Sequence, residues 1–205
     1  MNNILLTIKR NEKLKSLLIK TISSSHHPRP RWWVRNFVNP FVHKREKGSI
    51  VRRSSRMDVF PWKHFHLGKR SMIEDFAVIN NGAGDVIIGD NTRVGIGTVI
   101  IGPVTIGNNV GIGQNAFISG FNHIYKPDEG IPEGRELQHR PVVIGDDSHI
   151  GANAVIVPGV QLGKWVIVGA GSVVTKDIDS YSLVVGNPAK VIKKYNKALL
   201  KWEKV

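Results

Sequence analysis

Histidine is the residue type in this chain best suited to proton transfer near neutral pH, and one of the eight histidines stands out by position. His123 directly precedes residues 124–143, a segment with no repeat of its own. Long irregular segments inside a compact domain are often functional. A histidine at the mouth of such a loop is placed to act as a general base, although a histidine in a surface turn would give the same pattern. The chain has no cysteine, which excludes disulfides, thiolate metal sites and a cysteine nucleophile.

The element that would hold His123 is a repeat of six residues. Fifteen aliphatic residues follow this spacing, with three extra residues at 85–87 and twenty at 124–143. They are Leu67, Ile73, Ile79, Ile88, Val94, Ile100, Ile106, Ile112, Ile118, Ile144, Ile150, Ile156, Leu162, Val168 and Val174. A strand has period two and a helix period 3.6, so neither explains a strict six.

Glycine follows the aliphatic residue in most first and second repeats and in no third repeat, so the true period is eighteen residues. This pattern predicts an all-β fold, a parallel β-helix of about five three-sided coils over residues 67–186. One aliphatic side chain fills each face, and we expect glycine to permit the bend at the corners. A β-sandwich with regular turns is the alternative, but it would show looser spacing.

The flanks differ from the repeat in charge and composition. Residues 1–70 hold 17 Lys and Arg against three acidic residues, a net charge of +14, whereas residues 71–205 carry −1. Residues 1–66 form a basic extension with an amphipathic helix expected at 3–22, and residues 187–205 indicate a short basic helix. These flanks could cap the β-helix and make oligomer contacts, or meet an anionic membrane surface through residues 1–65. No motif supports nucleic-acid binding.

The pattern resembles the hexapeptide-repeat acyltransferases, whose left-handed β-helices form trimers with sites between subunits. Residues 169–176 (GAGSVVTK) and 186–193 (GNPAKVIK) look like the closing coil of the sugar O-acetyltransferase branch, and residues 122–125 (NHIY) resemble the segment with its catalytic histidine. The resemblance implies that acetyl-CoA donates an acetyl group to a sugar or polysaccharide hydroxyl, with His123 as general base and no metal. We expect a cytoplasmic protein, which the basic flank could place at the inner membrane face.

The resemblance also implies cofactor contacts along the groove between two subunits. Small residues would let pantetheine lie against backbone, and others would lie near the adenosine and its phosphates. The matching positions are Gly151, Ala152, Gly169, Ala170, Thr175, Lys176, Lys190 and Lys193. Each lysine could equally be a solvated surface charge.

Two departures from the family pattern bear on the site. His149 stands where the family often has Trp, and residues 92–98 lack the Asn and Asp that hold the acceptor in the galactoside branch. Glu74, Asp75, Asn80 and Asn81 are alternative acceptor-facing residues, although corner and solvent positions explain them as well. Amino-sugar N-acetylation is the nearest rival function. A non-catalytic binding protein and a γ-type zinc carbonic anhydrase are the others.

Overall fold

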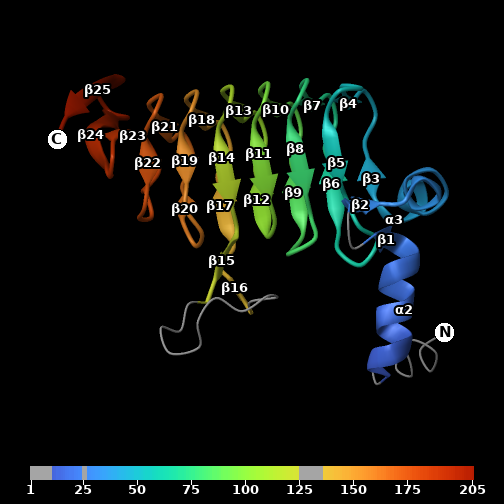
Figure 1. Ribbon diagram of the computed structural model, residues 1–205. Coiled ribbons are helices and arrows are strands. Elements are labelled where there is room, and N and C mark those ends of the chain that lie inside the picture. The colour runs from blue at the N-terminus through green and yellow to red at the C-terminus, as the bar shows by residue number, and fades with distance from the viewer. Residues whose placement is uncertain (1–10, 25–26, 125–135) are drawn as a thin grey trace.

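The repeat folds into a parallel β-helix in which every coil has three short faces (Figure 1). The computed structural model describes residues 11–24, 27–124 and 136–205. Within the stacked coils, each strand pairs in parallel with the strands of the neighbouring coils, as Val94 does with Ile73 and Ile112. The step from Val94 to Ile112 is the predicted eighteen residues, and the step from Ile73 to Val94 is twenty-one because it includes the three extra residues. The all-β fold class is confirmed.

The three faces are successive sheets, and we name the corners between them edge 1–2, edge 2–3 and edge 3–1. Face 1 consists of β3 (Lys44–Arg45), β6 (Phe65–Leu67), β9 (Val86–Ile88), β12 (Val104–Ile106), β17 (Val142–Ile144) and β20 (Gln161–Leu162). Face 2 consists of β4 (Ile50–Val51), β7 (Met72–Ile73), β10 (Arg93–Val94), β13 (Gly111–Ile112), β18 (His149–Ile150), β21 (Ile167–Val168), β23 (Ser182–Gly186), β24 (Ala189–Asn196) and β25 (Lys201–Lys204). Face 3 consists of β5 (Arg56–Asp58), β8 (Val78–Asn80), β11 (Val99–Ile101), β14 (Phe117–Ser119), β19 (Val155–Ile156) and β22 (Val173–Val174).

The core is the column of aliphatic side chains that the repeat predicts. All fifteen point inward, and none is more than 3% exposed. Burying a side chain of this size contributes roughly 1.5–3 kcal/mol, so the column is the main source of stability. The three extra residues after β8 lie in the turn at edge 3–1, between Asn80 and Val86.

The corner glycines have a different role from the one expected. Gly89 and Gly107 do not have positive φ; at edge 1–2 the left-handed residues are instead Asn91 and Asn109, with φ of 53° and 57°. A Cβ on Gly89 would lie 2.5 Å from the carbonyl oxygen of Gly107 in the next coil. Glycine is needed here because successive coils approach closely, whereas asparagine, which tolerates the left-handed region, makes the bend.

The β-helix begins one coil before the first predicted repeat. β3, β4 and β5 form coil 1 (residues 44–58), in which Arg45, Val51 and Met57 pair with the first predicted repeats of coil 2. The remaining coils are coil 2 (65–80), coil 3 (86–101), coil 4 (104–119), coil 5 (142–157) and coil 6 (161–174). There are thus six coils instead of about five.

The expected C-terminal helix over 187–205 is wrong. β24 folds back antiparallel on β23, and β25 pairs antiparallel with β24. Half-buried Ala189, Val191 and Tyr195 alternate with exposed neighbours, the period of a strand, and this segment covers the open edge of the last coil.

The N-terminal extension lies across the other end of the β-helix (Figure 1). It contains α2 (Glu12–Ile22), β1 (Ser23–Ser24), β2 (His27–Pro30), the π-helical turn η1 (Val34–Val38) and α3 (Asn39–Val42). α2 falls within the helix expected at 3–22, of which residues 1–10 lie outside the described residues. Among the described residues, no helix has the length and apolar character needed to cross a bilayer.

Candidate active site

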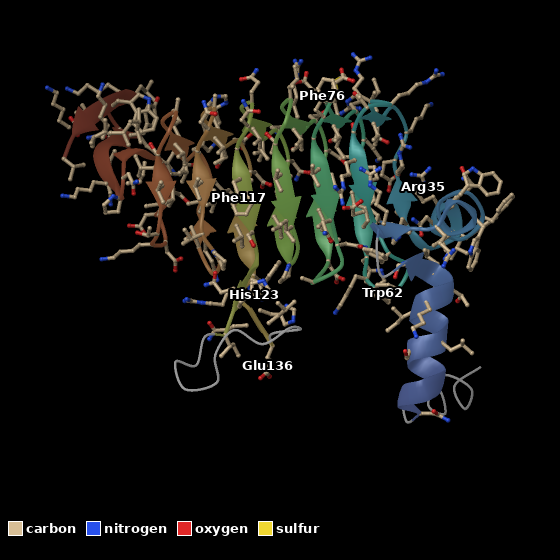
Figure 2. All side chains as sticks on the ribbon, in the orientation of Figure 1. Arg35, Trp62, Phe76, Phe117, His123 and Glu136 are labelled. Carbon is tan, nitrogen blue, oxygen red and sulfur yellow. The ribbon has the colours of Figure 1, made fainter. Side chains whose placement is uncertain are left out.

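His123 ends the first strand of a small hairpin that projects from edge 3–1 (Figures 1 and 2). β15 (Phe121–His123) pairs antiparallel with β16 (Leu137–His139), and His123 lies opposite Leu137. The His123 imidazole is exposed and packs edge-on against Phe121, with ring centroids 5.5 Å apart. The ring is therefore open to a substrate from outside the chain.

The base of this hairpin is tied to the coils on both sides. The Gly120 N–H donates to the Ile101 carbonyl oxygen at 2.8 Å, and the Arg140 N–H donates to the Gly120 carbonyl oxygen at 2.8 Å. The Gly159 N–H, in the turn between coils 5 and 6, donates to the Arg140 carbonyl oxygen at 2.8 Å. His123 is thus three residues from a buried anchor, which limits how far it can move, although residues 125–135 of the predicted loop lie outside the described residues.

The four small residues expected to face the donor lie together on edge 2–3. Gly151 and Ala152 turn this corner in coil 5, and Gly169 and Ala170 turn it in coil 6, with the Gly171 N–H donating to the Ala152 carbonyl oxygen at 2.8 Å. They form a continuous ridge without large side chains. Pantetheine could approach the backbone closely along such a ridge.

The basic and hydroxyl residues expected near the adenosine end are divided between two edges. Lys190 pairs with Val185, whose side chain packs against Gly169, so Lys190 continues the edge 2–3 ridge. Lys193 lies further along β24, opposite Leu183. Thr175 and Lys176 follow β22 and therefore lie on edge 3–1, the edge that carries His123.

A polar cavity of about 330 Å³ opens on face 2 beside the glycine ridge. On the outer side of this face, Gly111 stands between Arg93 and His149, and its missing side chain leaves the gap. The Arg93 guanidinium donates to the Glu74 carboxylate at one side of the cavity, while His149 and Ala152 line the other. The cavity thus offers a charged pair, an imidazole and an accessible backbone.

Sequence reasoning missed Arg93 and Gly111 as site residues, and it left Glu74 undecided. One signal was available, because Glu74 replaces glycine at a position where Gly95, Gly113, Gly151 and Gly169 stand in the later coils. The pairing of Glu74 with Arg93 requires knowing that the turn at 81–85, which contains the three extra residues, shifts the register between coils 2 and 3. Asp75 lies at the same corner and accepts a hydrogen bond from the Ser54 hydroxyl.

Two stretches of the chain match families defined by hexapeptide repeats. Residues 85–120 match the family described as "Bacterial transferase hexapeptide (six repeats)". Residues 141–176 match "Hexapeptide repeat of succinyl-transferase". The two stretches correspond to coils 3 and 4 and to coils 5 and 6, which flank the hairpin of His123.

Among curated proteins, the chain is 36% identical over 132 residues to the putative lipopolysaccharide biosynthesis O-acetyl transferase WbbJ of Escherichia coli, covering 60% of this chain and 67% of WbbJ. It is 35% identical over 120 residues to a chloramphenicol acetyltransferase of Agrobacterium fabrum, covering 56% of this chain. The match spans only about half (54%) of that second relative.

Among solved structures, the fold is similar to that of AntD, an N-acyltransferase from Bacillus cereus solved with dTDP-4-amino-4,6-dideoxyglucose and coenzyme A. The TM-score is 0.64 at 22% identity, covering 78% of this chain and 87% of AntD. A hexapeptide transferase family protein from Anaplasma phagocytophilum gives a TM-score of 0.59 at 16% identity, covering 77% of this chain and 82% of that protein. At these identities the likeness concerns the fold alone, a left-handed β-helix. Together with the repeats and the match to WbbJ, it shows that the chain belongs to the hexapeptide-repeat acyltransferase family.

Proposed function

We propose that the protein transfers an acetyl group from acetyl-CoA to a hydroxyl of a sugar or polysaccharide precursor, with His123 as general base. The observation that carries this proposal is the position of His123 along the axis of the β-helix, at the same level as the face 2 cavity. The residue follows coil 4, and the face 2 cavity is centred on Gly111 and Gly113 of the same coil. WbbJ, the O-acetyl transferase relative, supports a hydroxyl as acceptor, and the coenzyme A in the AntD structure supports an acyl-CoA donor.

We further propose a homotrimer, because the two halves of the site lie on different edges of one chain. His123 is on edge 3–1, whereas Gly113 and Ala152 are on edge 2–3, and one six-residue side of the coil, about 20 Å long when extended, separates these edges. A neighbouring copy with a parallel axis would bring its His123 to the level of this cavity. The outward row of face 3 is apolar and offers a packing surface: Val78, Val99, Phe117, Val155 and Val173.

The chemistry needs one group that first accepts and then donates a proton. The His123 imidazole would take the proton from the acceptor hydroxyl as its oxygen attacks the acetyl carbonyl carbon. When the carbon–sulfur bond breaks, the same imidazole would return the proton to the CoA thiolate. An exposed imidazole on an anchored hairpin suits both steps because it can meet two substrates in turn.

The donor would lie along edge 2–3 with its thioester toward the cavity. Gly151, Ala152, Gly169 and Ala170 would face pantetheine, and Lys190 and Lys193 beyond the last coil would meet its phosphates. Thr175 and Lys176 would reach the adenosine end from the neighbouring copy, whose edge 3–1 also supplies His123. The Glu74–Arg93 pair closes the other end of the cavity and would hold hydroxyl groups of the acceptor.

We also propose that residues 11–65 contact the anionic inner face of a membrane. Exposed aromatic side chains and an excess of positive charge favour such a surface. An enzyme held there would meet polysaccharide precursors that are attached to lipid.

The proposed function can be tested with labelled acetyl-CoA and a panel of sugars, nucleotide sugars and amino sugars. We expect a labelled product whose label is released by alkaline hydroxylamine, because an oxygen ester reacts with alkaline hydroxylamine and an amide does not. A stable label would instead identify amino-sugar N-acetylation. Absence of transfer, together with absence of CoA binding by calorimetry, would favour a non-catalytic protein.

A further inference from the structure

A second, larger cavity lies at the N-terminal end of the β-helix, far from the His123 hairpin. Its volume is about 510 Å³, within the range of roughly 300–1,000 Å³ that small-molecule sites occupy. It lies between coil 1 and the helical segment formed by η1 and α3. Its apolar walls are Pro40, Val51, Met57, Val59 and Phe65. The hydrophobic column of the β-helix therefore ends in an open apolar space.

The polar part of the cavity lining is cationic. Arg35, Lys44 and Arg45 line it, together with Asn39 and His43, and no acidic residue does. The Lys44 ammonium is paired with the Glu46 carboxylate at 2.7 Å. Within the described ranges, Arg35 and Arg45 form no ion pair, so two exposed guanidinium groups are available to an anion.

Two side chains in the wall carry buried polar atoms without a partner among the described residues. They are Asn39, through its Oδ1, and His43, through both ring nitrogens. Burial, and then the charge of His64, lowers the pKa of His43, so its ring is neutral with one donor and one acceptor. Buried polar groups in proteins are normally hydrogen-bonded, which indicates that a bound group belongs in this cavity.

Large exposed aromatic side chains lie on the chain segments next to the residues that line the cavity. Trp32, Phe37 and Phe41 are 65%, 62% and 87% exposed, and Trp33 and Trp62 are also exposed. Figure 2 shows Arg35 and Trp62 at the end of the β-helix that carries α2. A soluble anion would satisfy the arginines but would leave these aromatic rings in water, whereas a membrane surface accommodates both.

We propose that this cavity binds an anionic phospholipid, with one acyl chain between Pro40, Met57 and Phe65 and the phosphate at Arg35 and Arg45. The aromatic residues lie in the membrane interface around it. The inference rests on the membrane contact proposed above but not on acetyl transfer. It adds a defined lipid site to what would otherwise be a diffuse electrostatic contact.

The charge requirement can be tested with monomeric single-chain lipids, which need no membrane. Native mass spectrometry of the full chain should show one myristoyl lysophosphatidylglycerol per subunit and weaker binding of myristoyl lysophosphatidylcholine. Arg35→Glu should weaken the binding of the anionic lipid by about tenfold or more. Arg53→Glu, an equally basic exposed position of coil 1 outside the cavity, should not. Equal binding of the two lipids, or equal loss in the two variants, would overturn the proposal.

The cavity itself can be tested by filling it. Val51→Phe places a larger side chain in the cavity, whereas Ile50→Phe changes the neighbouring, outward-facing residue of β4. We expect Val51→Phe to abolish lysolipid binding and Ile50→Phe to retain it. The midpoint temperature of thermal unfolding, measured for both variants, shows whether each one folds. If Val51→Phe does not fold, Arg35→Glu still tests the same site. A Val51→Phe protein that folds and still binds one lipid would contradict the inference.

A vesicle experiment separates the lipid site from the surface around it. Phe41→Ala should reduce cosedimentation with phosphatidylglycerol vesicles but leave lysolipid binding intact, and Leu200→Ala at the opposite end should change neither.

Loss of subunit association in Arg35→Glu, with lipid binding unchanged, would show that another copy of the chain covers the cavity, and the proposal would then be wrong. Acetyl transfer to a soluble acceptor should be the same in all these variants, so failure of the lipid site and failure of the proposed function give different results.

Discussion

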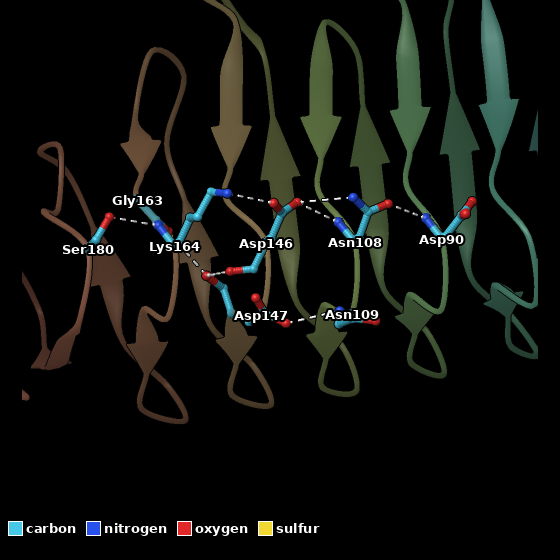
Figure 3. Close-up of polar contacts among 9 residues, drawn as sticks. Asp90, Asn108, Asn109, Asp146, Asp147, Gly163, Lys164 and Ser180 are labelled. Carbon is cyan, nitrogen blue, oxygen red and sulfur yellow. Dashed lines mark hydrogen bonds and ion pairs between the residues drawn. The ribbon is translucent and has the colours of Figure 1, made fainter. Parts of the chain in front are cut away.

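Asp146 joins three coils through a single carboxylate (Figure 3). It lies in coil 5, accepts a hydrogen bond from the Asn108 N–H of coil 4 at 2.9 Å, and pairs with the Lys164 ammonium of coil 6 at 3.1 Å. The Asn108 N–H, followed by Lys164, lowers the pKa of Asp146 below its usual value. A depressed carboxyl pKa adds stability above the unfolded pKa of about 4, and this stability is lost as the pH falls through the folded value.

Asp146→Asn should therefore destabilise the protein in a pH-dependent way. The amide retains an acceptor for the Asn108 N–H, as Asn108 itself does for Asp90, but loses the charge that pairs with Lys164. We expect the free energy of unfolding to fall by about 1 kcal/mol at pH 7, measured by urea denaturation, and this loss to shrink progressively as the pH falls below about 4. Asp177→Asn is the control, because Asp177 accepts the Gln161 N–H but pairs with no lysine among the described residues. A deficit of Asp146→Asn that stayed constant as the pH was lowered through the acid range would show that its charge is not the cause.

At the scale of the coil, the spacing between coils depends on glycines whose neighbours leave no room. A Cβ on Gly113 would lie 2.5 Å from the Ala152 nitrogen in the next coil, which is fixed backbone. A Cβ on Gly111, two residues earlier in the chain, would meet the movable His149 ring at 2.9 Å. Gly113→Ala should lower the free energy of unfolding by about 2 kcal/mol or more, and Gly111→Ala should lower it by less than about 1 kcal/mol. Thermal and urea unfolding measure both. Equal stability of the two variants would mean that the coils can separate freely.

The same elements show what sequence could predict. Coils 2 to 6 follow from the six-residue spacing because every face needs one buried aliphatic residue. Coil 1 escaped notice because Arg45 occupies an aliphatic position and ten residues, not six, separate Met57 from Leu67. The C-terminal strands were mistaken for a helix because a short basic segment has little period of its own, and its pairing with β23 decides its structure.

The candidate site was predictable only in part, for a similar reason. His123 could be found because it borders the one long interruption of the repeat. The face 2 cavity could not, because it depends on Glu74, Arg93, Gly111 and His149, which come from four coils and meet only through strand pairing.

At the scale of the whole molecule, the account requires that one active site be built from two chains. A His123→Ala chain retains its edge 2–3 ridge, and an Ala152→Trp chain retains His123 but has its ridge blocked. Each variant alone should be inactive. Trimers that contain both variants should recover about a third of wild-type activity, since a working site needs His123 from one variant beside the ridge of the other and each mixed trimer has one such pair of neighbours.

Mixed trimers are obtained by co-expression with two affinity tags, and acetyl transfer is measured after purification on both. Activity should return in the mixed trimers. It should not return when the two variants are purified separately and combined under conditions in which their subunits do not exchange. This pair of results would support sites shared between chains. No recovery in mixed trimers whose unblocked ridges still bind acetyl-CoA would mean that His123 and the ridge act within one chain.

The most direct test of the central claim compares two histidines of the same hairpin. His123 and His139 are both exposed on β15 and β16, but only His123 is assigned the proton transfer. We predict that His123→Ala lowers kcat/KM for acetyl transfer to the best acceptor by about 10²–10⁴-fold. The affinity of this variant for acetyl-CoA should stay within about twofold of the wild-type value. His139→Ala should leave both quantities near wild type. Full activity in His123→Ala, or an equal loss in His139→Ala, would contradict the assignment of His123 as general base.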